Sequence, residues 1–175
     1  MKINTKTTFL FVLYLSLSNM SFGQTTSKIN KNNDKYDSVI VETVINATPE
    51  KVWSLLTNWE VLPTLSESLP YKKIEGGENE GDKLSFYMKS GSKFKINMLK
   101  KVPNQSLHWG MDMGNIFAFI HGYDIIDNHD GTVTFHQEEK YFGIVKLTTT
   151  QKMMEDYEKT YIELNNNLKA LAEKD

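Results

Sequence analysis

The sequence predicts an α+β protein in which a curved antiparallel β-sheet wraps around one long C-terminal α-helix. Two observations lead to this prediction. Between residues 84 and 141, apolar and polar side chains alternate in several short runs, which is typical of strands that bury one face. From Leu147 onward, apolar side chains instead recur every three or four positions, which indicates an amphipathic helix. The apolar face of the sheet and the apolar stripe of the helix are expected to cover each other.

The N-terminus has the pattern of an export signal. Lys2 and Lys6 precede an uncharged apolar run over residues 9–17, and the small residues Ser21 and Gly23 follow it. We therefore expect residues 1–23 to be a signal peptide that is cleaved near Gly23, and the mature protein to be periplasmic or extracellular. The apolar run is shorter than the roughly 20 residues that span a bilayer, so no stable membrane anchor is expected.

Composition narrows the range of functions. The chain of 175 residues is long enough for one domain and contains no cysteine, which excludes a thiolate nucleophile and a cysteine metal site. All of its basic residues are lysine, and the formal net charge is −2, the wrong sign for a surface that binds nucleic acid. The four histidines include no pair at helical spacing, so no metal and no other cofactor are expected.

The mature chain begins with a polar stretch, residues 24–35, which its composition predicts to be a flexible linker before a single domain over residues 36–175. A first strand is expected from Tyr36 to Ile45, because β-branched residues alternate there. Thr48 and Pro49 predict the start of a helix, and a second short helical piece is expected over residues 59–62, ended by Pro63. This first helix has an apolar face made of Val52, Trp53, Leu55 and Leu56.

Parity then assigns the faces of the later strands, because successive side chains point to opposite sides of a sheet. The apolar face is predicted to hold Leu84, Phe86, Met88, Phe94, Ile96, Met98, Leu107, Trp109, Met111, Met113, Phe117, Phe119, Tyr123 and Ile125. The final helix is expected to begin between Lys146 and Met153, because the threonines at 148–150 weaken its first turn. Its apolar stripe is Leu147, Met154, Tyr157, Tyr161, Leu164, Leu168 and Leu171.

Three polar residues interrupt these apolar faces. Gln137 and Glu139 alternate with Val133, Phe135 and Tyr141, and His121 lies between Phe119 and Tyr123. A three-residue turn over 129–131, with Gly131 in the left-handed conformation, would pair Asn128 with Thr132. That register places His121 opposite Glu139, Tyr123 opposite Gln137 and Phe119 opposite Tyr141. A register shifted by two residues would leave His121 and Glu139 diagonal and still within reach of each other. A histidine and a carboxylate are therefore expected to meet on the face that the helix covers.

The chain resembles the START/polyketide-cyclase-like superfamily, also called SRPBCC or helix-grip, and within it the polyketide cyclase/dehydrase and lipid-transport branch. The resemblance runs from about Ser38 to Glu173. It rests on the segments INATPEKVWSLLTNWE, VPNQSLHW, HGYDIIDNHDGTVTFHQEEKYFG and NNNLKALAE, in this order. Where the family commonly shows Trp-Asn-Pro after the first helix, this chain has Pro63-Thr64-Leu65. The resemblance implies a deep cavity between sheet and helix that takes an apolar or amphipathic small molecule.

Three functional hypotheses follow. The first is an exported, non-catalytic protein that encloses a hydrophobic ligand, lipid-like or aromatic, without a cofactor. The second is a cyclase or dehydratase in which His121 and Glu139 act as an acid–base pair on a polyketide-like or carbonyl substrate, with Tyr123 or Tyr157 as proton donor. The third is an interaction module whose own side chains fill the cavity. The predicted ligand-binding residues are Phe86, Met88, Phe94, Ile96, Met98, Trp109, Phe119, His121, Tyr123, Phe135, Gln137, Glu139, Met154, Tyr157 and Tyr161. Plain core packing is an equal alternative to lining the cavity for Trp53, Trp59, Trp109, Met153, Met154, Tyr157 and Tyr161.

Overall fold

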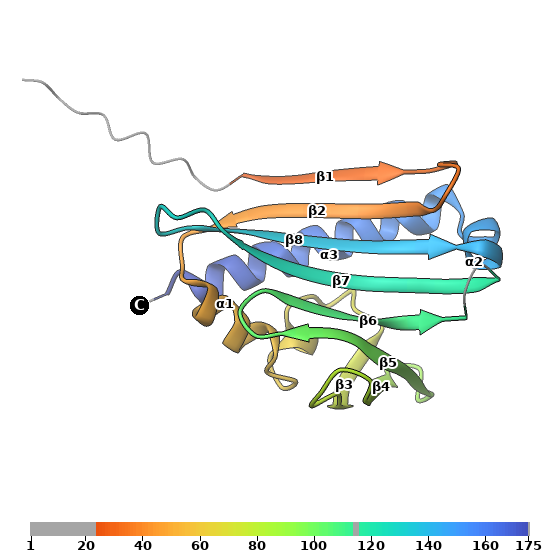
Figure 1. Cartoon of the computed structure of the whole chain (residues 1–175), viewed down its shortest axis with the longest axis horizontal. Coiled ribbons are helices and arrows are strands. Elements are labelled where there is room, and N and C mark those ends of the chain that lie inside the picture. Colours follow the sequence, from red (N-terminus) through yellow and green to blue (C-terminus); the bar gives the residue numbers. More distant parts are fainter. Residues whose placement is uncertain (1–23, 114–115, 175) are drawn as a thin grey trace, which may run out of the picture.

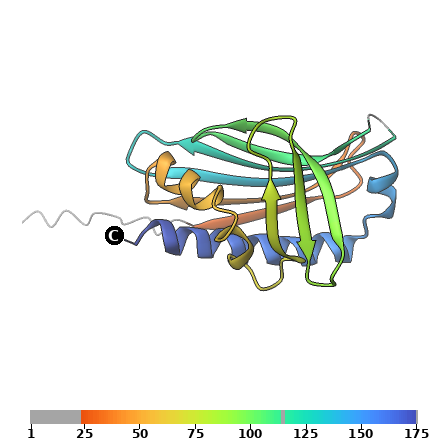
Figure 2. The ribbon, with the colours of Figure 1, turned by 90° about the horizontal axis from the view of Figure 1, so that it is seen from below.

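The computed structural model describes residues 24–113 and 116–174. The expected signal peptide lies outside these residues. In the described part of the chain, one sheet of eight antiparallel strands curves around a long helix, α3, which packs against β1 and β2 (Figures 1 and 2). The predicted fold class is therefore confirmed. No helix among the described residues has the length and apolar character needed to cross a membrane.

The strands are hydrogen-bonded in the order β1-β2-β8-β7-β6-β5-β4-β3. Their bounds are β1 Thr25–Asn30, β2 Asp37–Ile45, β3 Tyr71–Gly76, β4 Lys83–Met88, β5 Lys93–Val102, β6 Ser106–Asp112, β7 Phe117–Asp127 and β8 Val133–Phe142. The helices are α1 Pro49–Leu56, the 3-10 helix η1 Leu62–Thr64, α2 Gly143–Thr148 and α3 Gln151–Ala172.

The prediction of a flexible linker over residues 24–35 was wrong for half of that stretch. Residues 25–30 form β1, an edge strand paired with β2 from Thr25 opposite Thr43 to Asn30 opposite Ser38. Backbone hydrogen bonds hold this edge strand, whose side chains are polar except for Ile29, so apolar alternation is not needed there. The Thr25 hydroxyl also lies 2.9 Å from that of Thr43. The polar composition of residues 24–35 therefore did not indicate the strand β1.

The first strand and helix follow the prediction. In β2 the alternating side chains of Val39, Val41, Thr43 and Ile45 are buried. The Thr48 hydroxyl accepts a hydrogen bond from the backbone N–H of residue 51 at 3.3 Å and caps α1.

The second helical piece was misplaced. Residues 59–61 form a turn, and Pro63 lies inside η1 instead of ending a helix. The fixed φ of proline suits the first turn of a helix, where its missing N–H costs nothing.

The C-terminal helix begins at Gln151, inside the predicted window, and the Thr150 hydroxyl caps it by accepting from the backbone N–H of Met153 at 3.2 Å. The predicted stripe was wrong at Leu147, which belongs to the separate helix α2 and is 81% exposed. The break at Thr149 and Thr150 lets the chain turn before α3 begins, so the buried stripe starts at Met154. Its buried members are Met154, Tyr161, Leu164 and Leu168.

Two residues assigned to the apolar sheet face are exposed. Met113 follows the end of β6 and is 65% exposed, and Phe94, near the start of β5, is 40% exposed. Both lie near strand ends, where burial of the sheet face is incomplete. Elsewhere the parity assignment holds, and Leu84, Phe86, Ile96, Leu107 and Trp109 are buried.

The register of the last hairpin is confirmed. Asn128 donates its backbone N–H to the carbonyl of Thr132 at 3.1 Å, and Gly131 adopts a left-handed φ of 91°. His129 is left-handed as well, with a φ of 59°. The resulting ladder pairs His121 with Glu139, Tyr123 with Gln137 and Phe119 with Tyr141. This pairing positions the candidate site.

Candidate functional site

A cavity of about 470 Å³ lies between the inner face of the sheet and α3. Its walls come from the middle strands, from the loop before β3, from α2 and from the N-terminal half of α3. Most of the predicted ligand-binding residues border it, namely Phe86, Met88, Phe94, Ile96, Trp109, Phe119, His121, Glu139, Tyr157 and Tyr161. Met153, for which core packing was the alternative, borders it too.

Other predicted residues do not border the cavity. Met98, Tyr123, Phe135, Gln137 and Met154 are at most 1% exposed and are not part of its wall. They point to the predicted face, but neighbouring side chains cover them. The Tyr123 and Phe135 rings, for example, stack at 5.5 Å. Trp53 and Trp59 pack against the main core instead.

Sequence reasoning also missed part of the wall. The missed residues are Ser68, Leu69, Pro70, Tyr71, Tyr141, Val145, Thr148, Thr149, Asp156 and Thr160. Strand parity could have found Tyr141, two residues after Glu139, and helical spacing could have found Thr160, three residues after Tyr157. Residues 68–70 and 148–149 lie outside the long periodic elements, so they carried no such signal.

His121 and Glu139 meet inside the cavity as the register requires. The His121 Nδ1 lies 3.5 Å from the Glu139 Oε2, and the two side chains are 9% and 12% exposed. The same oxygen accepts a hydrogen bond from the Tyr161 hydroxyl of α3. On the other side of the imidazole, Nε2 lies 3.1 Å from the amide nitrogen of Gln137. If Nε2 accepts a hydrogen bond from that amide, the imidazole proton is on Nδ1. Nδ1 then donates a hydrogen bond to Glu139.

Aromatic packing fixes the plane of this imidazole. The Trp109 ring stacks on His121 with centroids 5.4 Å apart and an interplanar angle of 8°. The rings of Tyr123 and Tyr161 meet it edge-on at 4.7 and 5.1 Å. The imidazole is therefore held by its neighbours on its faces and edges, and both of its nitrogens have a polar contact.

The tyrosines near Glu139 are held neutral. Burial raises the pKa of Tyr141 and of Tyr157, and the charge of Glu139 raises both further. The Tyr141 hydroxyl is buried beside Glu139 in this wall of the cavity.

No family model and no curated protein matches the sequence. Among solved structures, CalU16 from Micromonospora echinospora superposes with a TM-score of 0.60 at 12% identity, over 86% of this chain and 87% of that one. Truncated norcoclaurine synthase from Thalictrum flavum gives 0.52 at 12% identity, over 82% and 99%. The di-domain ARO/CYC StfQ of the steffimycin biosynthetic pathway gives 0.54 at 9% identity, over 80% and 51%.

This chain has the helix-grip fold. Identities this low establish the fold alone, so any chemistry has to be argued from the residues of this cavity. Within the described residues of this helix-grip protein, no group of three or more His, Cys, Asp or Glu side chains is arranged to hold a metal ion.

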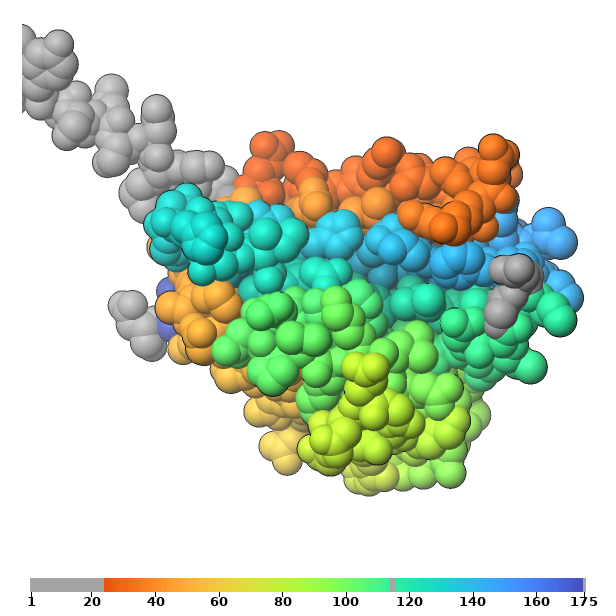
Figure 3. Space-filling view, in the orientation of Figure 1, coloured from red at the N-terminus to blue at the C-terminus, as the bar shows by residue number. Residues whose placement is uncertain are grey.

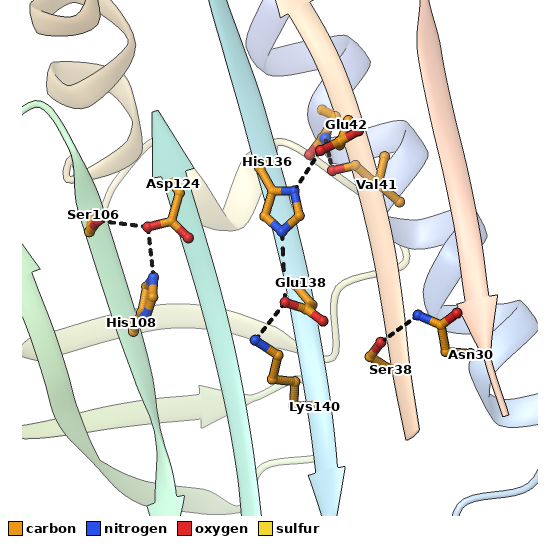
Figure 4. A network of polar contacts seen from close by, with 11 residues as sticks. Asn30, Ser38, Val41, Glu42, Ser106, His108, Asp124, His136, Glu138 and Lys140 are labelled. Atoms are coloured by element: carbon orange, nitrogen blue, oxygen red, sulfur yellow. Dashed lines mark hydrogen bonds and ion pairs between the residues drawn. The ribbon is translucent and has the colours of Figure 1, made fainter. Parts of the chain in front are cut away.

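A second polar cluster (Figure 4) lies on the outer face of the sheet, the face turned away from α3, which Figure 3 shows in a space-filling view. The Ser106 hydroxyl donates to Asp124 Oδ1 at 2.6 Å, and His108 Nε2 lies 3.0 Å from the same oxygen. Burial opposes ionisation of Asp124, but the bonds from His108 and Ser106 outweigh it and lower its pKa to about 2. A nucleophilic serine needs a base that contacts it, whereas here serine and histidine both contact the carboxylate. In this helix-grip protein, Ser106 and His108 are therefore joined through Asp124 and not to each other.

Beside it, His136 lies between two carboxylates. Its Nδ1 is 2.8 Å from Glu42 Oε1, and its Nε2 is 3.7 Å from Glu138 Oε2, which Lys140 also contacts at 2.7 Å. The carboxylates of Glu138 and Glu42 raise the pKa of His136 and outweigh the opposing effect of burial.

His136→Gln should destabilise the protein in a pH-dependent way. A folded-state pKa above the unfolded value means that the charged imidazole contributes its full stability below about pH 6.5, the ordinary value. That contribution is lost as pH rises through the higher folded pKa. Urea unfolding should therefore show a larger difference between wild type and variant at about pH 6 than at about pH 9. A difference that grows with pH would contradict this assignment.

Proposed function

We propose that this protein encloses a hydrophobic or amphipathic small molecule, lipid-like or aromatic, in the cavity between the sheet and α3. The observation that carries the proposal is the cavity itself. Its volume of about 470 Å³ lies in the range of small-molecule sites, and its walls are mainly apolar with a few converging polar groups. Among these, Glu139 and the Tyr141 hydroxyl are placed to orient the polar end of a ligand. An open cavity of this volume disfavours the third hypothesis, an interaction module whose own side chains fill the cavity.

The proposal includes export. The basic, apolar and small-residue order of residues 1–23 supports removal near Gly23 and a periplasmic or extracellular site of action. N-terminal sequencing of the protein from its own host should find a chain that begins near Gln24. An intact Met1 on the purified protein would overturn this part of the proposal.

Native mass spectrometry of the protein purified from its own host tests the binding function. We expect a co-purified apolar molecule that leaves on denaturation. In parallel, the neutral fluorophore N-phenylnaphthylamine should bind with one site per chain and a blue-shifted emission. A ligand-free protein that also fails to bind the fluorophore would overturn the proposal.

The second candidate is a cyclase or dehydratase, favoured by the contact of Glu139 with both His121 and Tyr161 inside the cavity. Two observations favour binding over catalysis. Both imidazole nitrogens already have polar contacts, and the partner of Nε2, Gln137, does not border the cavity. A free basic nitrogen directed at a substrate, which acid–base catalysis needs, would require that contact to break.

Glu139→Gln separates these two roles. If Glu139 binds the ligand, the change should weaken affinity by about 1.5 to 3 kcal/mol, the scale of one charge-assisted hydrogen bond, and neither protein should form product. If Glu139 is catalytic, affinity should stay nearly constant while turnover of a polyketide-like or carbonyl substrate falls about a hundredfold or more. We expect the first outcome. Calorimetric titration and chromatography of the ligand after incubation measure both quantities.

A further inference from the structure

The charges that border the cavity are unbalanced. The described residues of its wall include the carboxylates Glu139 and Asp156 but no lysine, and the chain has no arginine. Asp156 is exposed and forms an ion pair with Lys152, one turn earlier on α3. The lysine therefore compensates the charge of Asp156. Glu139 is the carboxylate that remains inside the cavity.

Glu139 has contacts but no lysine partner among the described residues. Its neighbours are the His121 Nδ1, at 3.5 Å, and the hydroxyls of Tyr161 and Tyr141. A carboxylate with only 12% of its side chain exposed is costly to bury unless a positive group accompanies it. The charge of Glu139 also acts across the cavity, because it adds to the effect of burial in raising the pKa of Tyr141 and Tyr157. The charge of Glu139 would repel a negatively charged group on a ligand in the same way.

Aromatic rings surround this carboxylate. The rings of Tyr157 and Tyr161 lie 5.9 Å apart at 12°, and those of Tyr141 and Tyr157 lie 6.4 Å apart at 26°. With Trp109, they give the cavity an aromatic wall on both the sheet side and the helix side. Aromatic rings attract cations through their negative faces, so rings beside a carboxylate make an environment suited to an ammonium group.

We infer that the cavity selects an amphipathic amine, whose ammonium group pairs with Glu139 among the rings of Tyr141, Tyr157 and Tyr161 while its apolar part fills the remaining space. A ligand carboxylate, such as that of a fatty acid, is disfavoured because the described wall has no lysine to receive it and both nitrogens of its histidine, His121, already have polar contacts. The inference rests on the proposed function and names the ligand class of the same site.

Competition against N-phenylnaphthylamine tests the inference with three compounds on one naphthylethyl skeleton, which end in an amine, an alcohol and a carboxylate. With the full chain near neutral pH, the amine should bind at least about tenfold more tightly than the carboxylate, with the alcohol between them. In Glu139→Gln this preference should fall to about twofold or less. Glu138→Gln is the matched control, because it removes one charge from the same strand on the outer face and should keep the preference.

The outcomes separate the inference from the proposed function. A wild-type protein that does not bind the fluorophore overturns the function, whereas one that binds it but shows no amine preference overturns only the inference. Equal loss of preference in Glu138→Gln would assign the effect to net charge and overturn the inference too. If Glu139→Gln fails to fold, Phe94→Lys provides the test, because a lysine at this half-exposed wall position should shift the preference toward the carboxylate.

Discussion

Replacing Leu164 with Ala should lower the free energy of unfolding by about 2 to 5 kcal/mol. Leu164 is completely buried in the main core, on the face of α3 that the sheet covers. Truncation removes apolar surface from this interface and leaves a void that rigid neighbours on the sheet cannot fill. Urea unfolding followed by the tryptophan fluorescence of the core measures the change.

Leu147→Ala is the matched control, since it makes the same truncation at a position that the sequence placed on the same stripe. Leu147 is 81% exposed in α2, so its truncation should change stability by less than about 0.5 kcal/mol. Equal losses in the two variants would mean that the helix stripe continues through residue 147 and that the break before α3 is wrong. A loss below about 0.5 kcal/mol for Leu164 would mean that α3 packs on another face.

The parts of the fold that could be predicted are those in which a local rule fixes a long-range arrangement. Strand parity and one turn around Gly131 determined the pairing of His121 with Glu139 across the β7–β8 hairpin. The weak turn formed by the threonines at 148–150 limited the start of α3 to a window of residues, within which the cap at Thr150 places it. For the hairpin, a shift by one residue was excluded because it would have exposed an apolar face.

The strand β1 could not be predicted, because its side chains show no apolar alternation. All its residues except Ile29 are polar. Its place is set by hydrogen bonds to the edge of β2, by the packing of Ile29 on the core, and by Thr25, whose hydroxyl donates to Asn166 Oδ1 of α3 at 2.6 Å. Such contacts depend on the finished sheet and leave no periodic signal in the sequence.

The cavity wall was predicted only in part, for a related reason. Parity tells which side chains face the helix, but it does not separate Phe86, which borders the cavity, from Phe135, which is completely buried beneath its neighbours. That difference depends on how the curved sheet approaches α3 at each point. It also depends on the segment 68–70 and on α2, which close the cavity at its ends without following either period.

Thr160→Trp should abolish ligand binding while leaving the protein folded. Thr160 lies on α3, is 7% exposed and borders the cavity between Asp156 and Tyr161. An indole at this position enters the space that a ligand would occupy, and it buries apolar surface of its own. A ligand that must give up about 150 to 250 Å² of contact loses roughly 4 to 6 kcal/mol at about 25 cal/mol per Å². The affinity for N-phenylnaphthylamine should therefore fall a hundredfold or more.

Lys159→Trp separates filling of the cavity from a general effect of adding tryptophan to α3. Lys159 is exposed on the neighbouring position of the same helix, so its replacement should leave the affinity for the fluorophore unchanged. Thermal unfolding of both variants should show Thr160→Trp as stable as wild type or more so, because the indole fills empty space. A Thr160→Trp protein that is folded and binds as tightly as wild type would place the ligand elsewhere. Loss of binding in both variants would show that the fluorophore responds to a change in the helix and not to the volume of the cavity.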